Sequence, residues 1–224
     1  TIAVSSCLEN SRRRLLPQQE ETQPMALPTT PSFRLDVKRA LIAGGSSGIG
    51  LACAAALAGA GAAVTIATRN ATEAVVHETR AAGFQAVGLE MDVSEIADED
   101  TVALNGPFDI IINVTSEMAH VGGSNHAVYC GTKFAVEGFS KAMAIEWGKQ
   151  GIRVNTICPT FIRTPLTEQT FDDPDRVAWI MDKIKLGRVG AVTDMMGPVV
   201  YLASDASAMM TGTHMLIDGG WTAD

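Results

Sequence analysis

The feature that most constrains the fold of this chain is a glycine-rich turn between an apolar run and an alanine-rich segment. Residues 39–43 are the short apolar run expected of a buried strand, and glycines at positions 44, 48 and 50 follow it. The alanine-rich residues up to about Ala58 then predict a helix. Glycines at such a turn let backbone N–H groups approach a phosphate, and the helix N-terminus adds partial positive charge. The turn therefore predicts a phosphate-binding loop, with a plain flexible turn as the alternative. Its spacing differs from the common G-x-G-x-x-G fingerprint.

Further apolar runs repeat this alternation of strand and helix along the chain. Strands are predicted at residues 63–67, 85–91, 108–113, 152–157 and 213–217, helices at 72–82, 95–104, 125–149, 174–185 and 194–202, and a loop at 158–165. The β-α-β-α-β order is complete by residue 92, which is half of a doubly wound sheet. The sequence thus predicts an α/β fold, a three-layer, doubly wound parallel sheet that is Rossmann-like. Asp173 and Asp194 are the expected N-caps of the last two helices.

The residues after the second predicted strand distinguish between two nucleotides. At this position an acidic side chain would bind a ribose 2′-hydroxyl, whereas an arginine accommodates a 2′-phosphate. The residues present are Thr68-Arg69-Asn70, with no acid. Arg69 therefore favours NADP over NAD as the cofactor. The alternative is that Arg69 is only an exposed loop residue.

A serine, a tyrosine and a lysine form the strongest candidate for a chemical site. Tyr129 and Lys133 are four residues apart on a predicted helix, so their side chains share one face. A free tyrosine titrates near ~10, and a neighbouring ammonium lowers such a pKa by favouring the phenolate. Ser116 follows the apolar residues 110–112 at the carboxyl end of a predicted strand, where α/β folds place ligands. The Tyr–Lys pair alone is compatible with chance on a solvated helix, but Ser116 and the glycine turn together favour a catalytic site.

Composition argues against several classes of function. The net charge of −8 at pH 7 disfavours nucleic acid and an anionic membrane surface as partners. Residues 48–67 carry no charge but are mostly weakly apolar Ala and Gly, so we expect no membrane span. The four cysteines show no C-x-x-C or metal-ligand spacing, and the four histidines are scattered. We therefore predict free thiols, a cytoplasmic location and no metal site.

Residues 1–34 differ in composition from the rest of the chain. They hold four prolines, the basic run Arg12-Arg13-Arg14 and a Gln/Glu-rich patch, without apolar periodicity. We therefore predict a disordered leader over residues 1–34, followed by a single domain over residues 35–224. Because Met25-Ala26 resembles a natural start, we hypothesise that residues 1–24 are artefactual. Deleting them should then cause no large loss of stability.

Several motifs occur in the same order as in one known family. The loop Gly44-x-x-x-Gly48-Ile49-Gly50 matches the pattern TGxxxGIG, with Ala43 in place of Thr, and Ser116, Tyr129 and Lys133 match a catalytic Ser and a YxxxK pair. Further matches are Asp92-Val93, the segment Pro159–Thr164 with Thr160 in place of Gly, Leu186-Gly187-Arg188 and Asp218-Gly219-Gly220. Through these motifs, from Leu35 to its C-terminus, the chain resembles the simple, single-domain members of the short-chain dehydrogenase/reductase family.

The resemblance implies a cofactor, a reaction and a role for each motif. The family interconverts carbonyls and secondary alcohols by hydride transfer with NAD(P). Tyr129 would be the general acid/base, Lys133 would lower its pKa and hold the nicotinamide ribose, and Ser116 would hydrogen-bond the substrate oxygen. Arg69 would bind the 2′-phosphate and Asp92 the adenine. The cofactor-binding residues implied are Gly44, Ser46, Ser47, Gly48, Ile49, Gly50, Thr68, Arg69, Asp92, Val93, Tyr129, Lys133, Ile162 and Thr164.

The chain departs from the family pattern between Asp109 and Asn113. There the family has a strand ending in Asn-Asn-Ala-Gly, a helix carrying a catalytic Asn, and then the strand ending in the catalytic Ser. Here the two strands look fused into residues 108–116, whereas a strand–helix–strand unit needs roughly 30 residues or more. We therefore predict an internal deletion, with one strand and one helix fewer than the family norm. The sheet must then either be badly destabilised or close up, with the fused run paired beside the first strand. Ser116, Tyr129 and Lys133 would then shift together by about one strand spacing, ~4.8 Å, relative to the glycine loop.

Two functional hypotheses follow. The first is an NADP-preferring oxidoreductase acting on a small-molecule carbonyl or alcohol, with residues 174–185 as a candidate lid. The apolar residues of that segment, Trp179 and Ile180 among them, face either the pocket or the core. The second is a catalytically inactive, internally deleted member that binds dinucleotide at most, because misplacement by ~1 Å can lower a rate about a hundredfold. A homo-oligomer is compatible with both, although a helix that the family uses in subunit packing is missing.

Overall fold

The computed structural model describes residues 27–69, 72–90 and 109–223 of the 224-residue chain. The chain divides into two compact units, Thr1–Thr30 and Pro31–Asp224, and every described helix and strand belongs to the second. In the described part of the predicted leader, residues 27–34, there is neither helix nor strand, and Leu35 is the first buried side chain of the described residues. The predictions for residues 1–26, for the helix at 95–104 and for Asp92-Val93 lie outside the described residues.

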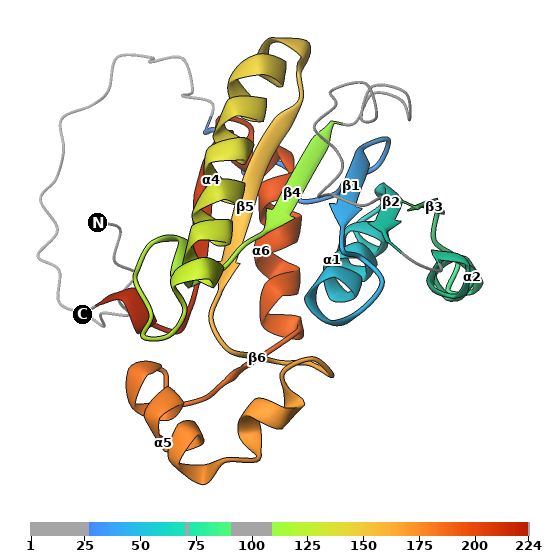
Figure 1. Cartoon of the computed structure of the whole chain (residues 1–224). Coiled ribbons are helices and arrows are strands. Elements are labelled where there is room, and N and C mark those ends of the chain that lie inside the picture. Colours follow the sequence, from blue (N-terminus) through green and yellow to red (C-terminus); the bar gives the residue numbers. More distant parts are fainter. Residues whose placement is uncertain (1–26, 70–71, 91–108, 224) are drawn as a thin grey trace, which may run out of the picture. The chain divides into compact units, whose positions relative to one another are not determined.

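The second unit is built on a parallel sheet, as the sequence predicted. Its six described strands run in the order β3-β2-β1-β4-β5-β8, and Figure 1 labels the first five of them. They are β1 Arg39–Ala43, β2 Ala63–Thr68, β3 Ala86–Glu90, β4 Ile110–Val114, β5 Arg153–Pro159 and β8 His214–Ile217. A separate two-stranded sheet pairs β6, Ile162–Arg163, with β7, Gly190–Ala191. Every ladder of the large sheet is parallel, which confirms the predicted fold class.

Helices cover both faces of the sheet and make three layers. The described α-helices are α1 Gly48–Gly59, α2 Thr72–Ala81, α4 Ala127–Trp147, α5 Pro174–Lys183 and α6 Thr193–Ala203; the short 3-10 helices are η1 Glu117–Ala119, η2 Gly148–Gln150, η3 Glu168–Phe171, η4 Asp205–Ser207 and η5 Trp221–Ala223. Successive residues of a strand point to opposite faces. Ile42 of β1 accordingly packs in a cluster with residues of α1 and α6, whereas Leu41 packs in another with Met143 and Ala144 of α4. None of the described helices combines the length and apolarity needed to cross a bilayer.

Strand β4 lies directly between β1 and β5, where the sequence predicted that the fused run would close the sheet. Its ladder to β5 has five residue pairs, but its ladder to β1 has only two. Arg39 and Asp109 add two hydrogen bonds before the short ladder: the Asp109 N–H donates to the Arg39 carbonyl at 3.2 Å, and the Arg39 N–H donates to Asp109 Oδ2 at 3.0 Å. The last residues of β1 have no partner on β4. Strand order also reverses here, and open α/β sheets bind ligands at such a point.

Two local predictions were wrong, for reasons that lie outside the local sequence. Strand β5 extends through Cys158 and Pro159, which were expected in a loop, because both residues pair with β8. Asp194 was expected to be the N-cap of the last helix, but α6 begins one residue earlier and Asp194 lies in its first turn. The Asp194 carboxylate accepts two hydrogen bonds from the Arg188 guanidinium, at 2.7 and 2.8 Å, and a third from the Ala191 N–H. It therefore faces the segment before the helix rather than the helix N–H groups.

Candidate active site

A cavity of about 660 Å³ lies at the carboxyl ends of β1, β4 and β5, a volume in the range of small-molecule sites. Its walls are the glycine turn, the end of β4, the first turns of α4 and the segment after β5. The structure thereby brings together most of the residues predicted for the site: Gly44, Ser47, Gly48, Ile49, Gly50, Arg69, Ser116, Tyr129, Lys133, Ile162 and Thr164. The predicted Ser46 and Thr68 are not among the lining residues, and Asp92 and Val93 are outside the described residues.

The glycine turn has a backbone that requires glycine at specific positions. Gly44 and Gly48 have positive φ angles of 76° and 51°. A Cβ on Gly50 would overlap the backbone carbonyl of Gly44, and a Cβ on Gly48 would lie 3.3 Å from Thr164 Cγ2. Helix α1 starts at Gly48 without an acidic residue in its first turn. Its N-terminal N–H groups and partial positive charge are therefore available to an anion in the cavity.

The end of β2 lies beside this turn. The Gly44 N–H donates to the Ala67 carbonyl at 2.7 Å, and the Ser46 and Thr68 hydroxyls are 3.2 Å apart. These bonds hold the turn against β2, so that the next residue, Arg69, reaches the cavity lining with an exposed side chain. An arginine here can meet a phosphate that extends from the glycine turn toward β2.

Ser116 lies at the other side of the cavity, where β4 ends. Its Oγ accepts a hydrogen bond from the Met118 N–H at 3.2 Å and donates to Glu117 Oε2 at 2.6 Å. Glu117 is buried, and its Oε1 accepts from the Thr160 hydroxyl at 3.1 Å. Burial raises the pKa of Glu117 above the usual glutamate value, against the lowering effect of these two hydrogen bonds. Sequence reasoning missed Glu117, because a carboxylate beside a serine is no signal by itself.

Tyr129 and Lys133 project from the start of α4, as their spacing predicted. Lys133 Nζ lies 5.5 Å from the centroid of the Tyr129 ring, and 43% of Tyr129 is exposed. The His126 ring packs edge-on against the same ring at 6.2 Å. Burial lowers the pKa of Lys133 below the usual lysine value, while Cys158 acts in the opposite direction. The phenol is therefore accessible to a ligand, and a cation lies beside it.

A second cavity, of about 300 Å³, adjoins the first and shares Ser116 and Tyr129 with it. Its other walls include Met118 and Phe161, and Arg176 of α5 contributes a cationic side chain. Ile180, from the predicted lid, does not face this cavity. It is fully buried in a core cluster with neighbours that include Ile184 and Trp221, so core packing accounts for it. Sequence reasoning missed Arg176, which lies on the same helix.

These features define the class of the protein: an α/β nucleotide-binding fold whose ligand cavity holds a serine, a tyrosine and a lysine. Comparison with known families gives a narrower assignment. Residues 38–105 match the family model described as short chain dehydrogenase, and residues 105–222 match the one described as enoyl-(acyl carrier protein) reductase. The chain belongs to the short-chain dehydrogenase family of NAD(P)-dependent oxidoreductases.

Individual relatives include several sugar and polyol enzymes. The chain is 32% identical over 258 positions to D-threitol dehydrogenase of Mycolicibacterium smegmatis, covering 90% of this chain and 99% of that enzyme. It is 38% identical over 133 residues to L-xylulose reductase of Bos taurus, which covers 59% of this chain but only 54% of that relative. Among solved structures it is similar to gluconate 5-dehydrogenase of Burkholderia cenocepacia in complex with NADP and tartrate. That match has a TM-score of 0.78 and 29% identity, and covers 86% of this chain and 98% of the other.

The alignment lengths bear on the predicted internal deletion. The alignment to D-threitol dehydrogenase has 258 positions, yet this chain supplies only 90% of its 224 residues, or about 202. About 56 aligned positions thus have no counterpart here. The two family models meet at residue 105, close to the junction expected between Asp109 and Asn113. Both observations agree with the loss of a strand–helix unit, which needs roughly 30 residues or more.

Proposed function

We propose that this chain is an NADP-preferring oxidoreductase that interconverts a carbonyl and a secondary alcohol by hydride transfer. The observation that carries the proposal is the shared cavity: the glycine turn, Arg69, Ser116, Tyr129 and Lys133 all line it. Arg69 follows β2 and lines the cavity, and an arginine at this point of the fold accommodates a 2′-phosphate, which supports NADP. The related gluconate 5-dehydrogenase was crystallised with NADP, which supports the same cofactor.

In this proposal three side chains handle the substrate oxygen and its proton. NADPH would supply a hydride to the carbonyl carbon. The Tyr129 phenol would donate its proton to the carbonyl oxygen, which becomes the alcohol, and in the reverse direction would take that proton back. The Lys133 ammonium, 5.5 Å from the ring, stabilises the phenolate that is left. Ser116 would orient the substrate by donating a hydrogen bond to the same oxygen.

The smaller cavity would hold the substrate, since it shares Ser116 and Tyr129 with the larger one. The relatives are named for a ketose, a polyol and a sugar acid. We therefore propose a small polyhydroxylated carbonyl or alcohol as the substrate class. The guanidinium of Arg176 would bind an anionic end of such a molecule, because its planar fork matches a carboxylate.

The second hypothesis, dinucleotide binding without turnover, is the alternative outcome of one experiment. NADPH and NADH are titrated against the purified chain by fluorescence, and turnover is then measured with L-xylulose, D-threitol and gluconate. We expect tighter binding of NADPH and measurable turnover of at least one compound. Binding without turnover would favour the inactive, internally deleted member, and binding of neither nucleotide would contradict both hypotheses.

A pair of variants tests the cofactor preference. Arg69→Ala should weaken NADPH binding about tenfold or more and NADH binding little, since a hydrogen bond to a charged group contributes about 1.5–3 kcal/mol. Lys149→Ala removes an exposed cation that does not line the cavity and should change neither affinity. Equal losses for both nucleotides in Arg69→Ala would show that this residue does not read the 2′-phosphate.

A further inference from the structure

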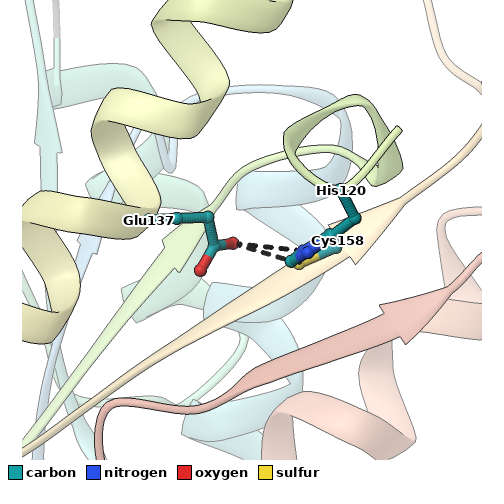
Figure 2. Close-up of side chains that lie close together, drawn as sticks. All are labelled: His120, Glu137 and Cys158. Atoms are coloured by element: carbon teal, nitrogen blue, oxygen red, sulfur yellow. Dashed lines mark hydrogen bonds and ion pairs between the residues drawn. The ribbon is translucent and has the colours of Figure 1, made fainter. Parts of the chain in front are cut away.

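Three side chains with metal-ligating atoms converge behind the catalytic cavity. His120 follows η1, Glu137 lies in the middle of α4, and Cys158 lies near the end of β5 (Figure 2). Glu137 and Cys158 are buried, and His120 is partly buried. The first two residues are 38 and 21 positions before Cys158 in the sequence, so no local spacing motif reveals the group.

The three ligating atoms form a nearly equilateral triangle. His120 Nε2 and Cys158 Sγ are 3.4 Å apart, Cys158 Sγ and Glu137 Oε1 are 3.3 Å apart, and Glu137 Oε1 and His120 Nε2 are 3.7 Å apart. Ligand atoms at about 2.0–2.3 Å from a tetrahedral Zn²⁺ lie roughly 3.3–3.6 Å from one another. The three separations in this group are close to that range, so the side chains stand near metal-binding distance of a common point.

The charges of the group also favour a cation. The only ion-pair partner of Glu137 among the described residues is His120, at 3.7 Å, and the remaining partners of Oε1 are the hydroxyls of Thr115 and Thr156 and the thiol of Cys158. A buried carboxylate is normally compensated by a cation. One Zn²⁺, one carboxylate, one thiolate and one neutral imidazole sum to zero charge. The two threonine hydroxyls would remain bonded to the Glu137 oxygen and fix its orientation.

The geometry excludes the other familiar use of these residue types. In a nucleophilic triad, the thiol and the carboxylate contact different nitrogens of the histidine, so that the carboxylate orients the ring. Here both Cys158 Sγ and Glu137 Oε1 approach the same nitrogen, Nε2 of His120. Cys158 therefore has no histidine that a carboxylate orients as its base, whereas three ligating atoms this close to one another suit a metal ion.

We propose that His120, Glu137 and Cys158 form a Zn²⁺ site, with a water molecule as the fourth ligand. Imidazole, carboxylate and thiolate are the ligand types that Zn²⁺ combines. On binding, a sulfur–zinc bond replaces the S–H bond of Cys158, and the proton leaves to solvent. Nothing is oxidised or reduced. The proposal does not depend on whether the chain is an active oxidoreductase.

The position of the site indicates which elements a bound metal would hold together. His120 is four residues after Ser116, Glu137 is four residues after Lys133, and Cys158 directly precedes Pro159 of the cavity lining. A metal bound to all three would link the segment after β4, helix α4 and strand β5. These are the elements that carry the catalytic side of the cavity, and Zn²⁺ would fix their positions relative to one another.

The test uses the full chain, stripped of metal with a chelator and reloaded with Zn²⁺ or Co²⁺. We expect one equivalent of Zn²⁺ per chain by elemental analysis. The Co²⁺ form should show the ligand-field bands of tetrahedral coordination and a thiolate-to-metal charge-transfer band in the near ultraviolet. The Co²⁺ spectrum needs no variant, so a wild-type chain that lacks the thiolate band overturns the proposal even if every variant fails to fold.

Variants identify the ligands. Cys158→Ser should abolish the thiolate band. It should also weaken Zn²⁺ binding at least about a hundredfold, because losing only a residue that hydrogen-bonds to a ligand already costs up to about that much. Glu137→Gln should retain the band and also bind Zn²⁺ more weakly. Cys130→Ser is the matched control, because Cys130 is a buried free cysteine outside the triangle, and it should bind as the wild type does. Zn²⁺ affinity that survives in Cys158→Ser would show binding to surface histidines only and refute the site.

Discussion

The variant Glu117→Gln is the most direct test of the role proposed for Ser116. In the structure the Ser116 hydroxyl donates to Glu117 Oε2 at 2.6 Å and accepts from the Met118 N–H at 3.2 Å. A serine has only one hydroxyl proton, and here the carboxylate holds it. That hydrogen bond must break before Ser116 can donate to a substrate oxygen. Glu117 should therefore oppose the proposed reaction whenever it is ionised.

The size of the effect follows from the two hydrogen bonds that are exchanged. A hydrogen bond to a charged group contributes about 1.5–3 kcal/mol and a neutral one about 0.5–1.5 kcal/mol. Replacing the hydrogen bond from Ser116 to the Glu117 carboxylate by one from Ser116 to a neutral substrate oxygen therefore costs about 1–1.5 kcal/mol. This corresponds to roughly five- to tenfold in kcat/KM. A glutamine amide at position 117 can donate to Ser116 Oγ and leave the serine proton free. We expect Glu117→Gln to raise kcat/KM about five- to tenfold at pH values where Glu117 is ionised.

The pH dependence has a definite sign. Burial raises the pKa of Glu117 above its ordinary value. A carboxyl whose folded pKa is raised contributes stability that is fully present below its unfolded pKa and is lost as pH rises through the folded pKa. Both the melting temperature and kcat/KM of the wild type should therefore fall as pH rises across that interval. The Glu117→Gln variant should not show this fall in melting temperature or in kcat/KM, because a glutamine side chain has no titrating proton.

The assay is a set of initial rates with NADPH and L-xylulose, together with melting curves, over the same pH range. Glu146→Gln, at an exposed position of α4, is the control for the loss of one negative charge and should leave both profiles unchanged. The decisive comparison is made in a Ser116→Ala background. If Glu117→Gln still raises kcat/KM there, the gain does not come from the serine proton and the reasoning is refuted.

Three further variants test the rest of the site. Tyr129→Phe removes the proposed acid and should lower kcat by about 10²–10⁴-fold while NADPH binding is retained; unchanged turnover would exclude the role. Gly50→Ala places a Cβ against the Gly44 carbonyl and should weaken NADPH binding at least about tenfold, whereas Gly59→Ala, whose Cβ would meet only Phe84 at 4.0 Å, should be tolerated in the same titration. Arg176→Ala should raise KM for gluconate about tenfold more than KM for the uncharged L-xylulose, as measured by steady-state kinetics. Equal increases in KM for the two substrates would contradict carboxylate binding by Arg176.

The sequence predicted those parts of the fold that local patterns determine. The strand at 39–43, the glycine turn and the start of α5 all follow from residues within a few positions. Asp173 accepts the N–H groups of Asp175 and Arg176, as its place before Pro174 predicted. The shared face of Tyr129 and Lys133 is local in the same sense, because it requires only the period of a helix.

Features that depend on pairing between distant segments were not predictable in this way. Cys158 continues β5 because β8 lies beside it, and Asp194 turns away from α6 because Arg188 competes for it. The buried Glu117 carboxylate accepts from Ser116 with one oxygen and from Thr160, 43 residues further on, with the other. The metal-ligand triangle requires three elements to meet, which no spacing along the chain records. The predicted roles of Asp92 and Val93 stay predictions, since both lie outside the described residues.

The short ladder between β1 and β4 has a consequence for how this sheet unfolds. The β1–β4 ladder has two residue pairs, against five between β1 and β2 and five between β4 and β5. We therefore expect the sheet to unfold as two cooperative blocks that meet at this boundary. One block carries the glycine turn and Arg69, and the other carries Ser116 and, through α4, Tyr129 and Lys133. Across the boundary, packing of α1 against α6 supplies much of the remaining contact. A ligand that bridges the two blocks would stabilise this boundary before any other part of the protein, because binding free energy is gained only when both halves are in register.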